Sequence, residues 1–205
     1  LAKITEDGLL SGLKKKNVPF QLTFDETNEE PITLPAIFPN LLCNPNMGIG
    51  VAMAASWACH NLGEVANAIY DYLDGKEPML PGPDFPGGGL IINKDDIPAI
   101  MRTGHGSVKI RGQYKIEKQN IVFYEIPYGT KTEDLLNEIG KASDEKVIEG
   151  IADYHTDLKD GVKITITLKK DANPQVVLNN LYKHTAFQSN YGIILLIINK
   201  KTPKT

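Results

Sequence analysis

Gly161-Val-Lys-Ile-Thr-Ile-Thr-Leu-Lys169 is the stretch that decides the fold class. Its apolar side chains, at Val162, Ile164, Ile166 and Leu168, alternate with polar ones. Because neighbouring side chains of a strand point to opposite faces of a sheet, this alternation predicts a strand with one buried face. A buried face must be covered by another layer of secondary structure, so the elements on either side of this strand are the next evidence.

Helices and strands are expected on both sides of this strand. Asn173-Pro174 is typical of a helix start, and Thr130 with Glu133 has the spacing of a helix cap. The expected elements are strands at 120–127, 148–154, 162–169 and 193–198, and helices from 130 to about 142 and from 173 to about 184. This order is β-α-β-β-α-β, the split βαβ pattern. It predicts an α+β fold, a two-layer sandwich with two helices on one face of a mostly antiparallel sheet.

The first half of the chain is irregular and rich in loops and small residues. Asn61 and Glu64 have the spacing of a capping box, and an apolar stripe follows them at helical spacing. The expected elements are a helix over 1–16, extended chain over 17–40, a small apolar stretch with a central turn over 41–60, a helix from 61 to about 75, a short strand at 90–93, a short helix at 95–102 and a strand at 107–117.

The composition is that of a soluble globular protein. Of the 205 residues, 41% are hydrophobic and 23% are charged, which excludes a disordered tail, a collagen-like repeat and a coiled-coil rod. The longest apolar run, 193–198, is far shorter than a membrane span. The first residues do not resemble a signal peptide, and the missing initiator Met leads us to expect a fragment of a longer, cytoplasmic protein. Cys43 and Cys59 are expected to be reduced thiols.

Charge is segregated along the chain, although the net charge is only −3. Residues 61–99 carry seven acids and two lysines, and residues 131–160 carry nine acids and four lysines. Residues 100–130 carry five basic residues and two acids, and residues 161–205 carry seven lysines and one acid. This distribution permits a basic face on an acidic protein, and it is equally compatible with charges that only solvate the surface.

The residues by themselves indicate no reaction. The four histidines show no metal-ligand spacing, and His60 is expected to be structural; we predict no metal site. Both glycine clusters, 87–89 and 104–106, precede strands rather than helices, which argues against a phosphate-binding loop. The strand 161–169 carries no aromatic residue, so the stacking platform of an RNA-recognition module is absent.

Seven strings, in order along nearly the whole chain, resemble motifs of bacterial type IIA topoisomerase A subunits, the family of gyrase A and topoisomerase IV A. They are LPAIFPNLL (34–42), GIGVAMA (48–54), HNLGEV (60–65), PGPDFPGG (81–88), RTGHGSVKIRG (102–112), EIPY (125–128) and KKDANPQVVLNNLYKHT (169–185). The first two resemble the family's LPxRFPNLL and GIAVGMA. This resemblance implies an ATP-dependent enzyme that cuts one DNA duplex in both strands and passes a second duplex through the gap.

The resemblance also implies what this chain lacks and which region it covers. The family's nucleophilic tyrosine lies a few residues before the family segment that matches the start of this chain at Leu1. We therefore expect no catalytic residue in this chain. Residues 1–30 are expected to end the winged-helix region, 31–106 to form the first part of the tower domain with a DNA-bending loop, and 107–200 to form its α+β sandwich. A partner B subunit supplies ATP hydrolysis and the Mg²⁺ centre, and the complete A subunit forms a homodimer on bacterial chromosomal DNA.

Ile49 matches the family's isoleucine that wedges between base pairs and bends the duplex. An apolar wedge unstacks a base step, and the bend brings more phosphates against the protein. The other residues expected to contact DNA are Asn44, Met47, Gly48, Arg102, Lys109, Arg111 and Lys115. The last three alternate along the strand predicted at 107–117, so we expect them to present three cations on one face to the phosphate backbone.

The chain departs from the family pattern at several positions. Ile37 stands where the family usually has Arg or Lys near the DNA, and Ser56-Trp57-Ala58-Cys59 replaces a stretch that ends in two prolines. His105 stands where the family has Arg, and Gln113 stands where the family often has Arg. The alternative to a topoisomerase fragment is a non-catalytic α+β module that binds DNA or a protein.

Overall fold

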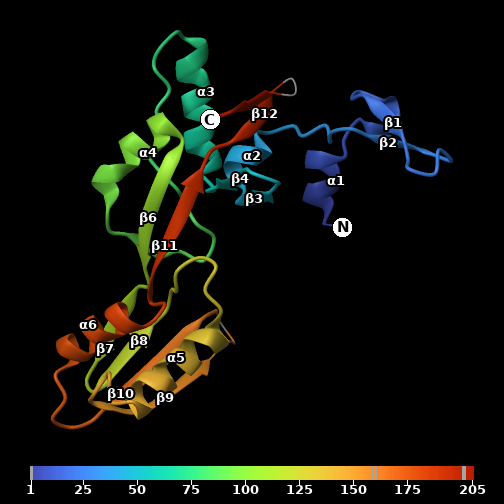
Figure 1. The fold of residues 1–205 in the computed structure, drawn as a ribbon. Coiled ribbons are helices and arrows are strands. Elements are labelled where there is room, and N and C mark those ends of the chain that lie inside the picture. Colours follow the sequence, from blue (N-terminus) through green and yellow to red (C-terminus); the bar gives the residue numbers. More distant parts are fainter. Residues whose placement is uncertain (1, 158, 160, 200–201) are drawn as a thin grey trace.

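The computed structural model describes residues 2–157, 159, 161–199 and 202–205. Leu1, where the predicted segment 1–30 begins, and position 200, where the predicted segment 107–200 ends, lie outside the described residues. The described chain forms two units joined end to end (Figure 1). We call them the five-stranded unit and the sandwich, after their sheets. The predicted α+β class is confirmed.

The elements have the following bounds. The helices are α1 (Lys3–Leu9), α2 (Asn40–Cys43), α3 (Leu62–Leu73), α4 (Ile97–Thr103), α5 (Thr132–Asp144) and α6 (Pro174–His184), with 3-10 turns η1 (Leu13–Lys15) and η2 (Lys94–Asp96). The strands are β1 (Phe20–Leu22), β2 (Glu29–Pro31), β3 (Asn46–Ile49), β4 (Ala54–Trp57), β5 (Leu90–Ile91), β6 (His105–Arg111), β7 (Tyr114–Glu117), β8 (Asn120–Phe123), β9 (Ile151–Asp157), β10 (Lys163–Leu168), β11 (Gln188–Ile194), β12 (Ile197–Asn199) and β13 (Thr202–Lys204).

The sandwich is a four-stranded antiparallel sheet in the order β7-β8-β10-β9, with α5 and α6 on one face. The apolar residues Ile164, Ile166 and Leu168 of β10 are buried in the core as predicted, but Thr165 between them is also buried, so the strand does not have one purely solvent-exposed face. Phe123 of β8 stacks on Phe187, with the ring centroids 3.6 Å apart. Both helices contribute apolar residues to this core, so the predicted two-layer packing is present.

The five-stranded unit is an antiparallel sheet in the order β3-β4-β11-β6-β5. One face of β6 carries the buried residues Val108 and Ile110, which pack with Ile97 and Ile100 of α4. Gly104 ends α4 in the left-handed conformation, with φ +69°, and leads directly into β6. The helix α4 therefore covers one face of this sheet.

The predicted single strand at 107–117 is wrong, because the chain forms two strands in two different sheets. β6 ends at Arg111 in the five-stranded unit, and β7 begins at Tyr114 in the sandwich. A Cβ atom on Gly112 would lie 2.7 Å from the carbonyl oxygen of Glu125. Only glycine permits this close approach, so Gly112 marks the point where the chain leaves one unit for the other.

The last predicted strand also lies elsewhere. The order of the six predicted elements is present, but β11 runs from Gln188 to Ile194 and pairs with β6 rather than with the sheet of the sandwich. Seven residue pairs join β6 and β11, from Gln188↔Arg111 to Ile194↔His105. The pairing of β6 with β11 is therefore the most extensive in the sheet of the five-stranded unit.

Several local expectations change in detail. The stretch 41–60 contains the hairpin of β3 and β4, which the sequence did not indicate. Helix α5 is preceded by Lys131, which makes no side-chain cap, so the predicted cap by Thr130 is wrong. The helix expected over 1–16 ends at Leu9, and Gly12 follows with φ +85°. The caps at Asn61 and Asn173 are confirmed, since each side chain accepts a backbone N–H bond of 2.9 Å.

Candidate nucleic-acid interface

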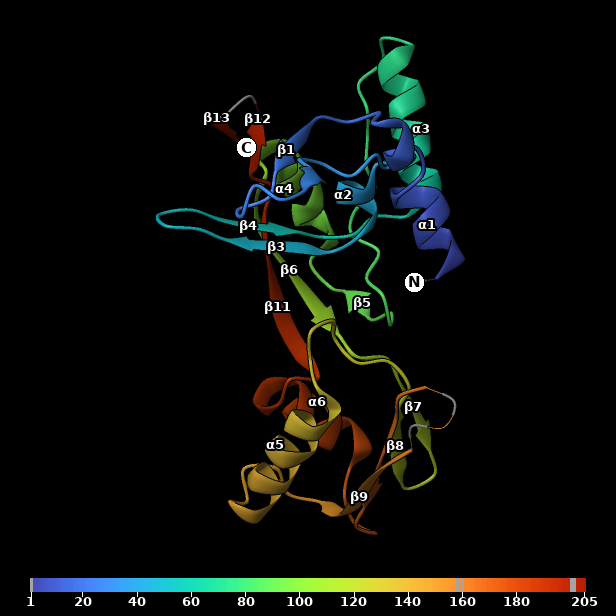
Figure 2. The same ribbon diagram turned by 90° about the vertical axis from the view of Figure 1, so that its right-hand side faces the viewer.

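The hairpin of β3 and β4 carries the exposed apolar residues that the sequence singled out. Ile49 pairs with Ala54 at the end of the ladder, and the N–H of Gly50 donates to the carbonyl of Met53 over 2.9 Å. Figure 2 shows the hairpin extending sideways from the five-stranded unit. Ile49 is 89% exposed and Val51 is 97% exposed. Because folding gains nothing from apolar side chains left in water, this tip is available for a contact with a partner.

Side-chain hydrogen bonds connect the base of the hairpin to β11 and to the residues just beyond it. The hydroxyl of Ser56 donates to the carbonyl of Gly192 over 2.7 Å, and the indole N–H of Trp57 donates to the carbonyl of Leu196 over 3.1 Å. The hydroxyl of Tyr191 donates to the carbonyl of Trp57 over 3.2 Å. The ladder between β4 and β11 contains a single residue pair. These three bonds are therefore an important part of what sets the direction of the hairpin.

The strand register places the hairpin residues and two of the basic residues on the same sheet face. Met47 pairs with Ser56, Ser56 with Ile194, and Ile194 with His105. Directly paired residues lie on one face, and every second residue along a strand returns to it. Ile49 thus shares a face with Lys109 and Arg111, opposite the face of β6 that α4 covers.

The remaining predicted residues of the hairpin region lie close in sequence but differ in their surroundings. Met47 is 68% exposed, on the same strand as Ile49. Gly48 lies opposite Ala55, where an added Cβ would meet the Ala55 Cβ at 3.8 Å. Asn44 follows α2, and its side-chain amide donates to Asn40 Oδ1 over 2.6 Å. The structure therefore brings Met47, Gly48 and Ile49 together and places Asn44 at the base of the hairpin.

The family model for the A subunit of DNA gyrase/topoisomerase IV matches residues 1–205. The chain belongs to this family. It is 41% identical over 218 residues to the DNA gyrase A subunit of Leptospira biflexa, covering 100% of this chain and 26% of the relative. It is 40% identical over 209 residues to the DNA topoisomerase 4 A subunit of Streptococcus pneumoniae, covering 96% and 25%, and 40% identical over 209 residues to the DNA gyrase A subunit of Rickettsia typhi, covering 96% and 23%. The chain thus spans about a quarter of the length of these relatives.

The arrangement expected for Lys109, Arg111 and Lys115 in this gyrase/topoisomerase IV segment is wrong. Lys109 and Arg111 share a face of β6, but Lys115 lies on β7 in the sandwich. The Nζ of Lys115 is 5.5 Å from the ring centroid of Tyr124. The even alternation from 109 to 115 suggested one strand, but the break at Gly112 separates the third cation from the other two.

Arg111 is held by contacts within the protein. Its guanidinium lies over the ring of Tyr182, 4.7 Å from the centroid, and its Nε donates to Gln188 Oε1 over 2.7 Å. Burial raises the pKa of Tyr182 to about 12, so its hydroxyl stays protonated and donates to the carbonyl of Gly112 over 2.7 Å. Arg111 is half-buried and therefore supports the junction between the two units. Lys109, in contrast, is exposed, as is Arg102 in the last turn of α4.

The structure gives one of the departures from the family pattern, Trp57, a role in holding the hairpin. Trp57, in the stretch that replaces one ending in two prolines, donates to the backbone beyond β11 and is 9% exposed. This buried side chain therefore helps to anchor the hairpin. Ile37 is 70% exposed, and nothing in the structure explains its departure from the family pattern.

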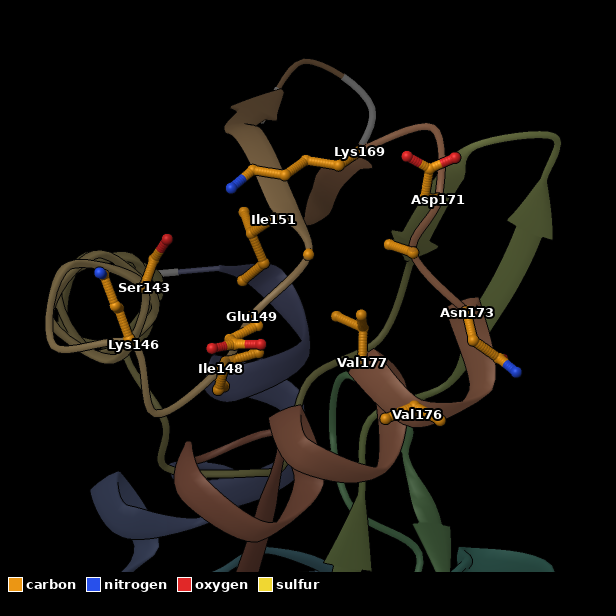
Figure 3. Close-up of a pocket in the computed structure, with 12 residues that line it drawn as sticks. Ser143, Lys146, Ile148, Glu149, Ile151, Lys169, Asp171, Asn173, Val176 and Val177 are labelled. Atoms are coloured by element: carbon orange, nitrogen blue, oxygen red, sulfur yellow. The ribbon is translucent and has the colours of Figure 1, made fainter.

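A cavity of ≈ 510 Å³ lies in the sandwich, away from the hairpin (Figure 3). Lys146 and Lys169 line it together with Glu149 and Asp171, so its charges balance. None of the residues predicted to contact DNA lines it. In the part of the chain that the structure describes, no group of three or more His, Cys, Asp or Glu side chains is placed to hold a metal ion. None of the described helices is long and apolar enough to cross a membrane.

Proposed function

We propose that this chain is the part of a type IIA topoisomerase A subunit that holds and bends the DNA duplex to be cut. The observation that carries the proposal is Ile49, 89% exposed at the end of a hairpin. The family membership supports the kind of ligand, and the shared sheet face supports its path, since Lys109 lies on the same side as Ile49. Met47, Gly48 and Asn44 would line the approach to the wedge.

The physical role of each group follows from its chemistry. Ile49 enters between two base pairs and unstacks them, which costs a few kcal/mol, and the additional phosphate contacts of the bent duplex offset that cost. Lys109 contributes a contact to a phosphate beside Ile49 that does not depend on sequence. Arg102, on α4, and Lys115, in the sandwich, lie away from that face and would contact other phosphates of the duplex. The hydrogen bonds of Ser56 and Trp57 hold the wedge in a fixed direction. Little free energy is therefore lost in ordering the hairpin when DNA binds.

The whole protein would break one duplex, pass another through it and rejoin the ends. Residues 1–30 would end the winged-helix region, 31–106 would begin the tower, and 107–200 would complete it. The nucleophilic tyrosine would precede Leu1, and Mg²⁺ and ATP would act through a B subunit of the gyrase B or topoisomerase IV B type. The complete A subunit would be a homodimer in the bacterial cytoplasm, bound to the chromosome.

The experiment replaces Ile49 in a complete A subunit that contains this segment, rebuilt with a B subunit. We expect Ile49→Ala to bind a fluorescently labelled duplex almost as well but to reduce the bent population by the factor that ~1–3 kcal/mol sets. Cleavage should fall with bending. Val51→Ala, two residues further along at the tip of the hairpin, is the matched control and should bend normally. Normal bending by Ile49→Ala would remove the wedge assignment.

A second measurement separates this proposal from a non-catalytic module. The 205-residue chain alone, incubated with supercoiled plasmid, Mg²⁺ and ATP, should neither nick nor relax it, because phosphoryl transfer needs a nucleophile and a metal-bound partner. The complete A subunit with its B subunit should relax or supercoil the same plasmid. Bending without any strand passage by the rebuilt enzyme would favour the non-catalytic module.

A further inference from the structure

Three aromatic rings meet where the sandwich contacts the five-stranded unit. The ring centroids of Phe85 and Tyr191 are 4.9 Å apart, those of Phe85 and Tyr128 are 5.4 Å apart, and those of Tyr128 and Tyr191 are 5.9 Å apart. We call these residues the three-ring cluster. Phe85 is buried in the core of the five-stranded unit, and both tyrosines pack against that core. None of the three is among the residues proposed to contact DNA.

Tyr128 comes to this cluster from the sandwich. It lies between β8 and α5, which both belong to the sandwich. The N–H of Thr130 donates to the carbonyl of Pro127 over 3.1 Å, and Gly129 has φ +82°, the left-handed value that a type II turn needs at its third residue. Tyr128 is therefore the second residue of a tight turn, from which its ring packs against the core of the other unit.

Tyr191 connects the cluster to the hairpin of β3 and β4. It lies on β11, and its hydroxyl donates to the carbonyl of Trp57, the last residue of β4, over 3.2 Å. The rings of Phe85 and Tyr128 meet the ring of Tyr191 at 64° and 65°, the edge-to-face arrangement that is favourable beyond its buried area. A rotation of the Tyr191 ring would carry its hydroxyl away from the carbonyl, so these two neighbours maintain the hydrogen bond.

Phe85 has a fixed place beside the base of the hairpin. The N–H of Asp84 donates to the carbonyl of Cys59 over 2.8 Å, and the thiol of Cys59 donates to the carbonyl of Asp84 over 3.0 Å. Cys59 follows the end of β4 by two residues. The loop of Phe85 is thus bound to the chain segment that Tyr191 also bonds, and Tyr128 is the ring of the cluster that the sandwich supplies.

We propose that Tyr128 is a positioning residue for the hairpin: it holds the ring of Tyr191 so that the hydroxyl reaches the Trp57 carbonyl, and through this bond the sandwich sets the direction of β3 and β4. A single residue pair joins β4 to β11, so the ladder alone resists a rotation of the hairpin only weakly. The consequence for DNA bending rests on the proposed function, because the hairpin carries Ile49.

The test measures the direction of the hairpin without DNA. Spin-labelled unnatural side chains are placed in pairs in the 205-residue chain, and electron–electron dipolar spectroscopy gives the distance distribution of each pair. Labels at Val51 and Asn137 connect the tip of the hairpin to α5. Labels at Asn190 and Asn137 connect β11 to α5 and are the internal control. All three labelled positions are exposed.

Tyr191→Phe removes the hydroxyl and keeps the ring. We expect the ratio of the original Val51–Asn137 distance population to all others to fall about fivefold, because one hydrogen bond contributes about that ratio. Tyr128→Leu removes the neighbouring ring and should have the same effect. The double variant should show no further change, because the two residues act in series. The matched control is Tyr128→Phe, which keeps the ring and should leave the distribution unaltered.

The Asn190–Asn137 distribution should stay the same in every variant, because the contact of Arg111 with Tyr182 still joins the two units. This control separates a turned hairpin from an unfolded chain or a parted junction.

Three results would overturn the proposal: an unchanged Val51–Asn137 distribution in Tyr128→Leu, a Tyr128→Phe variant that behaves like Tyr128→Leu, or a double variant in which the two effects add. If Tyr128→Leu does not fold, an unchanged distribution in Tyr191→Phe overturns it equally. The outcome is separate from that of the DNA experiment. Normal bending by Ile49→Ala removes the wedge and leaves this coupling, whereas a hairpin that does not respond to Tyr128 removes the coupling and leaves the wedge.

Discussion

The sandwich and the five-stranded unit differ in how completely each covers its own apolar surface. Among the described residues, the sandwich buries fifteen in one core cluster, and the five-stranded unit buries eight. The five-stranded unit also carries the largely exposed Ile49 and Val51, and Leu73 of α3 is 72% exposed. The sandwich is therefore built for its own stability, whereas the five-stranded unit reserves apolar surface for contacts with other molecules.

The strongest way to break this comparison is to remove a core side chain from the sandwich. Phe123 is fully buried and stacks on Phe187. Phe123→Ala should lower the free energy of unfolding by about 3–5 kcal/mol, because it loses buried area and leaves a cavity. Thermal unfolding monitored by circular dichroism measures the change. Ile116→Ala, at a 44% exposed position of the same sheet, should cost far less. Similar losses in both variants would mean that the sandwich has no consolidated core.

The junction between the units should be nearly as sensitive. Gly112→Ala places a Cβ 2.7 Å from the Glu125 carbonyl oxygen, so the backbone must shift, at a cost of about 1–3 kcal/mol. Gly192→Ala is the matched control, because no atom lies within 4 Å of an added Cβ on that glycine of β11. Chemical denaturation of both variants measures the difference. A Gly112→Ala variant as stable as Gly192→Ala would show that the junction is loose.

Local signals in the sequence predicted those elements that local interactions stabilise. The alternation of β10 and the caps at Asn61 and Asn173 all depend on residues within a few positions of each other. The break at Gly112 was invisible, because apolar residues occupy even positions on both sides of it, from Val108 to Ile116. What makes that position different is the close approach of groups that are distant in sequence, above all the Glu125 carbonyl oxygen.

The candidate site was predictable in part, for the same reason. Ile49 and the small residues around it mark an unusual loop in the sequence. The direction of the hairpin, however, depends on bonds from Ser56 to β11 and from Trp57 to Leu196, more than a hundred residues away. In the sequence, nothing distinguishes Arg111 from the other basic residues of this segment. Its contact with Tyr182 exists only after β11 and α6 return to the junction.

The two cations of β6 sharpen the comparison, because one faces solvent and the other supports the junction. Lys109→Ala should leave the melting temperature unchanged and reduce the log–log salt slope of DNA binding by about 0.9, the value for one phosphate contact. Arg111→Ala should lower stability by about 1–2 kcal/mol through loss of the Tyr182 and Gln188 contacts. Fluorescence anisotropy over a range of salt concentrations, together with thermal melting, measures both effects. An unchanged salt slope for Lys109→Ala would place the duplex on another face.

The smallest expected effect concerns the buried imidazole of the five-stranded unit. Burial lowers the folded-state pKa of His60 below its ordinary value of 6.5. The unfolded chain therefore binds a proton first as the pH falls, so His60 contributes stability that is full above pH 6.5 and is lost progressively below it. The slope contributed by this one proton is at most about 1.4 kcal/mol per pH unit. The sandwich buries no histidine among its described residues, so this dependence belongs to the five-stranded unit.

The comparison variant for this dependence is His60→Asn, whose side-chain amide can donate to the Leu42 carbonyl in place of Nδ1 but does not titrate. Denaturation at pH 7.5, 6.5 and 5.5 should show the unaltered chain losing stability faster than His60→Asn below pH 6.5. The two proteins differ only at this position, so the difference between their curves isolates His60. Parallel curves would mean that His60 is as hydrated in the folded chain as in the unfolded one. In that case water already satisfies its Nε2.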